Sequence, residues 1–352
     1  MHRRVSRKHL KKQRNFVILS LFVLLLCLSF GYAAFETNIN LKAKGNLKQK
    51  AISIDALKQA VVTSGDGLYK DSLKDGRYIY RGADPNNYIT LDNDTYRIIS
   101  IEDDGTLKVM KNTILKLIPF DNVDNRHEEG TYCTGVYENK YAGCSVWGSI
   151  NTVLDKNGNN VTTWPNYYGS SEYYKLPTKE AGINTYLNTT WYNSLSNDVK
   201  DVIVSHYFDI GAVSVYNTSS SMSEIYNQES LYKWQGKIAL INIYDYMNAS
   251  PNDNCHASLY NNWQSLCSSL KTCSCAANNY IGVGQKVITP VRQDAAPRTT
   301  VITIYFYGSL STITANSQSP EDHISYKPAF YLSSSIMLKG EGTNNNPYKI
   351  AK

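Results

Sequence analysis

The chain has 352 residues, of which 42% are hydrophobic and 19% are charged, and its formal net charge is +6 at pH 7. This composition excludes a disordered tail and a protein with many membrane spans, and the length allows one large domain or two small ones. Lys and Arg total 36 against 30 for Asp and Glu, but seven basic residues precede residue 16. The rest of the chain is close to neutral, which excludes nucleic-acid binding, because a phosphate-binding surface needs a clustered positive surplus.

Residues 1–35 predict the compartment of the protein. We assign residues 1–15 to the cytoplasm because they hold seven cations and no acid: Arg3, Arg4, Arg7, Lys8, Lys11, Lys12 and Arg14. Residues 16–35 carry no charge. Twenty helical residues at about 1.5 Å each span about 30 Å, the thickness of the hydrocarbon core of a bilayer. Because positive residues stay on the cytoplasmic side, the chain after this segment is predicted to be exported.

The apolar segment has two possible fates. Its length favours a retained transmembrane helix, which would make a single-pass protein of the cell membrane with an extracellular C-terminal domain. Gly31-Tyr32-Ala33 also places small residues where a signal peptidase requires them, so cleavage after Ala33 would yield a secreted protein instead.

The cysteines fit an exported protein. Cys27 lies in the apolar segment, and an even number follow it: Cys133, Cys144, Cys255, Cys267, Cys273 and Cys275. Outside the cell these six are predicted to form disulfides, with Cys133–Cys144 and pairing within the 255–275 group favoured by their clustering. A zinc site made by three of these cysteines and His256 is the alternative. The spacing lacks two C-x2-C pairs, so we expect no metal and no cofactor.

The exported part divides into a stalk and a globular domain. Residues 36–66 contain few aromatic residues and predict a stalk with a short strand at 40–44 and a helix at 54–62. Of 28 tyrosines only Tyr32 precedes Tyr69, so the domain is assigned to residues 67–352. Its first strands are predicted at residues 78–80, 88–91, 96–102 and 106–110, and Asp103-Asp104-Gly105 fits a tight hairpin turn between the last two.

The rest of the domain predicts helices between strands. Residues 120–172 are polar and indicate a loop insertion, in which Asp155 to Asn159 predict a turn. Helices are predicted at 178–195 and again after Ser196, where the second helix would contain Val199, Ile203 and His206. A strand at 237–241 and a helix at 244–248 follow, and strands at 299–307, 310–314, 331–332 and 347–350 close the chain. Strands at both ends with helices between them indicate an α+β fold whose termini lie near each other.

The sequence contains no recognisable catalytic motif: HExxH, G-x-S-x-G, P-loop and GxGxxG patterns are absent. We therefore expect a protein that is not an enzyme, and His206 is interpreted as a half-buried packing residue. Aromatic residues in the polar loop are candidates for stacking on sugars or on a partner protein: Trp164, Tyr167, Tyr168, Tyr173 and Tyr174. A second candidate loop holds Arg292, Asp294 and Arg298, for which a surface ion pair is the alternative. An Asn- and Tyr-rich composition alone also explains the tyrosines.

Four blocks of sequence resemble a family of exported surface proteins of Gram-positive bacteria, a domain of unknown function related to C-type lectin-like domains. They are residues 76–82 with 85–88, residues 96–100 with 104–110, residues 186–188 with 191–195, and residues 327–332 with 342–343 and 346–350. The resemblance covers roughly residues 70–352 and implies a C-type lectin-like fold of antiparallel sheets with a few helices and long loops. The E-P-N, Q-P-D and W-N-D motifs of calcium-dependent lectins are missing, so calcium-dependent sugar binding is not implied.

These observations favour a membrane-anchored or secreted surface protein with a non-catalytic binding module for a glycan or a protein. One alternative is a structural component of the cell envelope without a small ligand. Another is an enzyme similar to formylglycine-generating enzymes, whose cysteine pair binds copper, because Cys273 and Cys275 are the only closely spaced pair outside the membrane segment.

Overall fold

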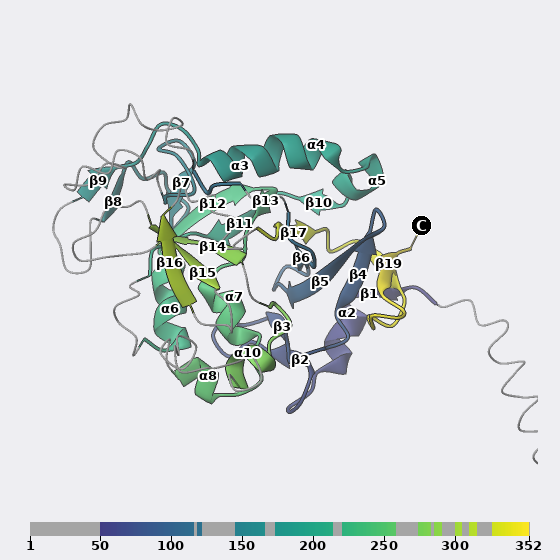
Figure 1. The fold of residues 1–352 in the computed structure, drawn as a ribbon. Helices are drawn as coiled ribbons and strands as arrows, with labels where there is room; N and C mark the ends of the chain where they lie inside the picture. The colour runs from purple at the N-terminus through teal and green to yellow at the C-terminus, as the bar shows by residue number, and fades with distance from the viewer. Residues whose placement is uncertain are drawn as a thin grey trace, which may run out of the picture. The chain divides into compact units, whose positions relative to one another are not determined.

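Strands from the two ends of the described chain meet in one large sheet (Figure 1). The computed structural model describes residues 50–115, 118–121, 145–165, 173–213, 220–257, 274–282, 285–290, 300–304, 310–314 and 326–351. Eleven of the described strands join in this sheet. Its main path runs through β1 (Ile52–Ser53), β18 (Met337–Lys339), β19 (Tyr348–Ile350), β4 (Tyr88–Leu91), β5 (Asp94–Ile101), β6 (Leu107–Lys111), β17 (Ala329–Leu332) and β10 (Ile203–Val204).

The other strands of this sheet pair beside that path. They are β2 (Gly67–Lys70), which pairs with β3 (Tyr78–Arg81), β3 itself, which also pairs with β5, and β13 (Ile238–Ala239), which pairs with β17. Only the β19–β4 pair is parallel among the described pairs of this sheet. Antiparallel neighbours can be joined by short turns, as in the β2–β3, β4–β5 and β5–β6 hairpins.

Three smaller sheets complete the described strands. The first contains β7 (Val153–Asp155), β11 (His206–Asp209) and β12 (Tyr232–Gly236); the second contains β14 (Gln285–Pro290), β15 (Thr300–Ile304) and β16 (Leu310–Thr314); the third contains β8 (Thr163–Pro165) and β9 (Tyr173–Lys175). In the second sheet β15 and β16 pair antiparallel, as the predicted strands at 299–307 and 310–314 require. Their register matches Thr303 with Ser311.

The helices are short. They are α2 (Ile54–Leu57), a 3-10 turn at Lys58–Ala60, α3 (Gly182–Tyr186), a π-helical turn at Leu187–Trp191, α4 (Tyr192–Ser194), α5 (Asn197–Lys200), α6 (Met222–Glu229), α7 (Ile243–Asn248), α8 (Asn254–Ala257) and α10 (Ser274–Ala277). Figure 1 shows α3, α4 and α5 in one row, whereas α6, α7, α8 and α10 gather on another side of the unit. Sheets with segregated helices form an α+β arrangement, which confirms the α+β class that the order of predicted strands and helices indicates.

Turn chemistry explains the two hairpins that flank β5. Asp92 and Asn93 have φ angles of 49° and 65°, the left-handed conformation that both central residues of a type I′ turn require. Gly105, with φ of 82°, ends the turn between β5 and β6. The Asp-Gly pair therefore forms the turn that the sequence predicts.

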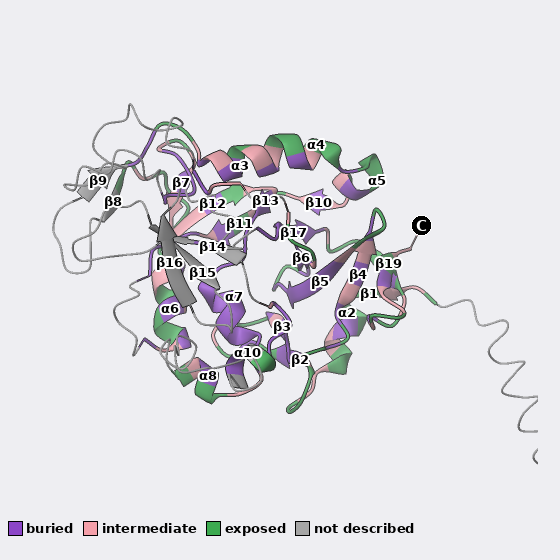
Figure 2. Cartoon of the chain, in the orientation of Figure 1, coloured by how far each residue is buried: buried purple, intermediate pink, exposed green. Residues whose placement is uncertain are grey.

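The core lies along the centre of the large sheet (Figure 2). Every residue of β6 and of β17 is buried, and β5 is buried from Tyr96 onward. Polar residues in these strands, such as Arg97 and Lys108, are therefore buried together with the apolar ones. An aromatic group packs beside them: Phe120, Trp147, Phe208, Trp234 and Tyr331.

Two predicted boundaries differ from the structure. The compact unit of the described residues begins at Ala51 rather than at residue 67, because Ile54 and Leu57 of the predicted stalk helix are 2% and 4% exposed and β1 pairs with β18. The helix predicted after Ser196 ends at Lys200. Ile203 then pairs with Leu332 of β17, since a β-branched run gains more from a sheet ladder than from a helix.

None of the helices in the described ranges is long and apolar enough to cross a membrane. The predicted membrane segment, residues 16–35, lies outside those ranges.

We expect a Gly342→Ala variant to lower the free energy of unfolding by about 2–4 kcal/mol. Gly342 has φ of +70°, and a Cβ there would lie 2.4 Å from the carbonyl oxygen of Asn86 and 2.4 Å from the Tyr348 ring. Gly65→Ala is the matched control, because Gly65 has φ of +75° with nothing within 4 Å. Urea denaturation should show a loss of only about 1–2 kcal/mol in this control. Equal losses in both variants would contradict the close contact.

Candidate functional site

A pocket of about 390 Å³ lies where the β5–β6 turn meets β11, β12, α6 and α7. Charged side chains supply much of its lining, with five carboxylates and four Lys or Arg side chains. These residues come from segments that are far apart in the chain, from Lys74 to Tyr331. Small-ligand sites are concave and usually have a mostly apolar lining with a few fixed polar groups, so this pocket is more polar than the usual site.

Arg77 organises the floor of the pocket. The β2–β3 turn places it directly before β3, and its side chain is buried. Nη1 lies 2.9 Å from Oδ2 of Asp71 and Nε lies 3.0 Å from Oε1 of Glu102. Nη2 donates to Oδ1 of Asp245 at 2.9 Å and to the Ser100 hydroxyl at 3.2 Å. One cation therefore binds three carboxylates that are themselves buried.

Two lysines complete this network. Lys74 Nζ lies 2.8 Å from Oε2 of Glu102, and Lys108 Nζ lies 2.5 Å from Oδ2 of Asp245. Asp245 is also fixed by its backbone, because it is the third residue of α7 and its N–H donates to Oδ1 of the N-cap residue Asn242 at 2.9 Å. The capping box thus holds the carboxylate where both cations reach it.

Mutual pairing keeps these groups charged. Burial alone would raise the pKa of Glu102, but Arg77 and Lys74 beside it hold that pKa well below its usual range. Burial would likewise raise the pKa of Asp245, and Lys108 and Arg77 lower it below its ordinary value. Asp71, Glu102 and Asp245 carry three negative charges against three positive ones, so the floor is neutral. A buried network with every member paired is rigid, and it holds the pocket in one shape.

His206 stands on the wall of the pocket. Its ring stacks on Tyr331 with a centroid distance of 3.8 Å and an angle of 19° between planes. Nε2 lies 3.4 Å from Oδ2 of Asp104, and the side chain is 17% exposed. The predicted half-buried packing role is therefore confirmed, but the residue belongs to β11 and not to a helix.

The remaining wall carries groups that the floor does not use. Asp209 and Lys233 lie opposite each other in the β11–β12 ladder, and both line the pocket. Neither makes a side-chain hydrogen bond or an ion pair with another residue in the described ranges. Burial raises the pKa of Asp209, and the nearby Lys74, Lys233 and Lys108 offset this only in part. Tyr207, which is 45% exposed, and Tyr226 add two aromatic rings to the lining.

The residues predicted from aromatic density lie elsewhere in the chain. Trp164 pairs with Tyr174 across β8 and β9, and Pro165 pairs with Tyr173, so the structure brings these segments together as a hairpin. The other predicted binding residues, which are Tyr167, Tyr168, Arg292, Asp294 and Arg298, lie outside the described ranges. The same holds for Cys133, Cys144, Cys267 and Cys273.

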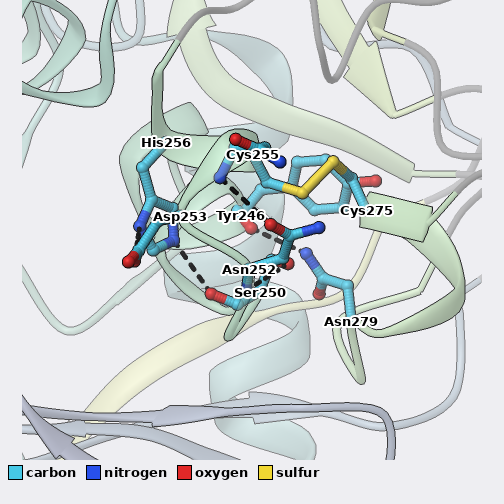
Figure 3. Close-up of a disulfide and its surroundings, with 9 residues drawn as sticks. Tyr246, Ser250, Asn252, Asp253, Cys255, His256, Cys275 and Asn279 are labelled. Atoms are coloured by element: carbon cyan, nitrogen blue, oxygen red, sulfur yellow. Dashed lines mark hydrogen bonds and ion pairs between the residues drawn. A yellow bond between two sulfur atoms is a disulfide. The ribbon is translucent and has the colours of Figure 1, made fainter. Parts of the chain in front are cut away.

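The structure joins Cys255 of α8 to Cys275 of α10 by a disulfide (Figure 3). The copper-enzyme alternative needs the thiol of Cys275 together with that of Cys273, and this disulfide occupies the first of them. The imidazole of His256 is also engaged, because Nε2 lies 2.8 Å from the Ser250 carbonyl oxygen. Among the residues that the structure describes, no three His, Cys, Asp or Glu side chains form a group that could hold a metal ion.

Sequence reasoning missed the pocket because its charged residues occur inside apolar segments. Lys108 lies in Leu-Lys-Val-Met-Lys and Asp245 in Ile-Tyr-Asp-Tyr-Met, patterns that ordinarily indicate a solvent-facing side chain. The available signal was the position of single charges within otherwise buried strands and helices. A lone charge in such a segment requires a partner, but the sequence does not show which one.

Comparison of the chain with protein-family models, with curated proteins and with solved structures gives no match. Its function must therefore be inferred from the geometry of this pocket and from the predicted export.

Proposed function

We propose that the chain is an exported surface protein whose domain binds a glycan, without catalysis, in the pocket beside β11 and β12. Residues 16–35 would anchor it in the cell membrane, or cleavage after Ala33 would release it. The domain would be a C-type lectin-like fold within the Gram-positive family that the sequence resembles.

The arrangement of the large sheet supports the lectin-like proposal. Ile52 of β1 pairs with Leu338 of β18, so the first and last parts of the unit share one sheet edge. Three of the four blocks that carry the resemblance supply strands of this sheet: β3 comes from the first, most of β5 and β6 from the second, and β17 and β19 from the last. The third block falls in the helical row, in the π-helical turn and α4 that follow α3.

The observation that carries the glycan proposal is an exposed ring above a rigid polar floor. Tyr207 is 45% exposed and lines a pocket whose floor is fixed by the Arg77 network. Sugars present apolar ring faces and hydroxyl groups, and they are bound by stacking on aromatic rings combined with hydrogen bonds to fixed polar side chains. Asp209 and Lys233 supply an acceptor and a donor beside that ring.

A glycan-binding assay with a Tyr207→Ala variant tests this proposal. We expect the purified full-length protein in detergent to bind selected oligosaccharides on a glycan array. The variant should bind them about five- to tenfold more weakly, because loss of a stacking ring costs about 1 kcal/mol. Met337→Ala is the matched control, since Met337 is 40% exposed and belongs to β18, outside the pocket lining. A full array without binding, or unchanged binding by Tyr207→Ala, would contradict the proposal.

A further inference from the structure

The charged residues that line the pocket form two sets. Members of the committed set are paired with other side chains, and members of the uncommitted set are not paired among the described residues. Glu102 and Asp245 are neutralised by Arg77, Lys74 and Lys108 at 2.5–3.0 Å. Of the other charged lining residues, Asp104 is paired, whereas Asp103, Asp209 and Lys233 have no side-chain hydrogen bond or ion pair among the described residues. Asp104 faces His206 at 3.4 Å and accepts hydrogen bonds from Thr106. The uncommitted set therefore holds more negative than positive charge, and a cationic ligand is electrostatically favoured over an anionic one.

Asp209 is the carboxylate of this set that is most removed from water. It is only partly exposed, and its raised pKa shows that the protein gives its charge less stabilisation than water does. Lys74, Lys108 and Arg77 act on it from the floor, but each of them already has a carboxylate partner. Lys233 faces Asp209 from the neighbouring strand and makes no ion pair with it in the described structure. A bound cation would supply the ion-pair partner that Asp209 does not have among the described residues.

We propose that the ligand is a glycan with a free amine, an amino sugar without its N-acetyl group, whose ammonium pairs with Asp209 while the sugar ring stacks on Tyr207. This inference rests on the proposed glycan-binding function and names its ligand class. An ammonium offers three N–H donors and a full charge to the carboxylate, whereas an acetamido group offers one N–H and no charge. N-acetylation of the same sugar should therefore weaken binding.

The test compares two oligosaccharides that differ only at nitrogen. A β-1,4-linked glucosamine tetramer and its N-acetylated form are titrated calorimetrically into the full-length protein at about pH 6, where the sugar amine is protonated. We expect the free-amine tetramer to bind at least tenfold more tightly. Equal affinities, or preference for the acetylated tetramer, would overturn the inference and leave the glycan-binding function standing. No binding of either tetramer would overturn this ligand class, and the glycan array then decides the proposed function separately.

An Asp209→Asn variant tests whether Asp209 causes the preference for the free-amine tetramer. It should lose at least tenfold in affinity for the free-amine tetramer and change less than threefold for the acetylated one. The variant is expected to fold, because it replaces a carboxylate whose charge is poorly stabilised with a neutral side chain of similar size, and its melting temperature checks this. Asp75→Asn, an exposed residue outside the pocket lining, is the control with the same change in net charge. Equal losses in both variants would indicate long-range electrostatics and overturn the role of Asp209.

Discussion

An Arg77→Met variant is expected to lose about 3–5 kcal/mol of its free energy of unfolding, or to fail to fold. The substitution keeps much of the side-chain volume but leaves Asp71, Glu102 and Asp245 without their shared cation. These three carboxylates are at most 1% exposed in their side chains. Two or three buried like charges in proximity repel each other, and protonation of at least one of them would be needed to relieve this.

Urea denaturation followed by tryptophan fluorescence measures this effect. Lys70→Met, an exposed lysine at the end of β2, is the control that removes one positive charge from the same hairpin, and it should change stability by less than about 0.5 kcal/mol. The Arg77→Met variant should also regain part of its stability as the pH falls from 7 towards 5, because protonation removes the uncompensated negative charge. A loss below about 1 kcal/mol in the free energy of unfolding would show that the Arg77 network contributes little to stability.

A Trp147→Ala variant is expected to lose about 3–5 kcal/mol, since the indole fills the aromatic group beside the sheet. Trp147 is fully buried, and its ring centroid lies 5.8 Å from that of Phe120 and 5.8 Å from that of Trp234, both in edge-to-face geometry. Alanine would leave a cavity lined by these rings, and rigid aromatic neighbours cannot collapse to fill it.

Trp147→Phe is the informative companion of this variant. The indole Nε1 has no hydrogen-bond partner among the described residues, so phenylalanine removes an unsatisfied buried donor and keeps most of the ring contact. We expect a loss below about 1.5 kcal/mol in urea denaturation. A larger loss in Trp147→Phe, close to that of alanine, would show that the N–H is hydrogen-bonded after all.

Local chemistry made much of the fold predictable. The Asp-Gly turn at Gly105 forms from neighbouring residues, and so does the N-cap at Ser196, whose side chain accepts a hydrogen bond from the N–H of Val199. These features can therefore be predicted from a short stretch of sequence. The helix predicted to contain Ile203 and His206 is wrong for the opposite reason. β10 and the start of β11 become strands because partners more than twenty residues away pair with them, and no local pattern carries that information.

The candidate site was not predictable from the sequence either, because its residues come from segments that are far apart in the chain. The sequence favours an aromatic-rich loop at Trp164 and a charged loop at Arg292, because rings and charges in polar loops ordinarily mark binding surfaces. The pocket instead uses Asp209 and Lys233 on short strands. Its floor uses charges that are buried only because three distant segments bring Arg77 to its carboxylates. Such a constellation exists only in three dimensions.

The order of strands in the large sheet also constrains how the protein can be made. β4, β5 and β6 are translated early, yet β19 and β17, which pair with their two outer sides, come from residues 329–350. A ribosome therefore releases most of the polypeptide before this sheet can close, and until then its apolar strands have open edges. A nascent chain whose sheet cannot close before its last segment is translated remains unfolded until then. An unfolded chain is the form that can pass through a narrow translocation channel.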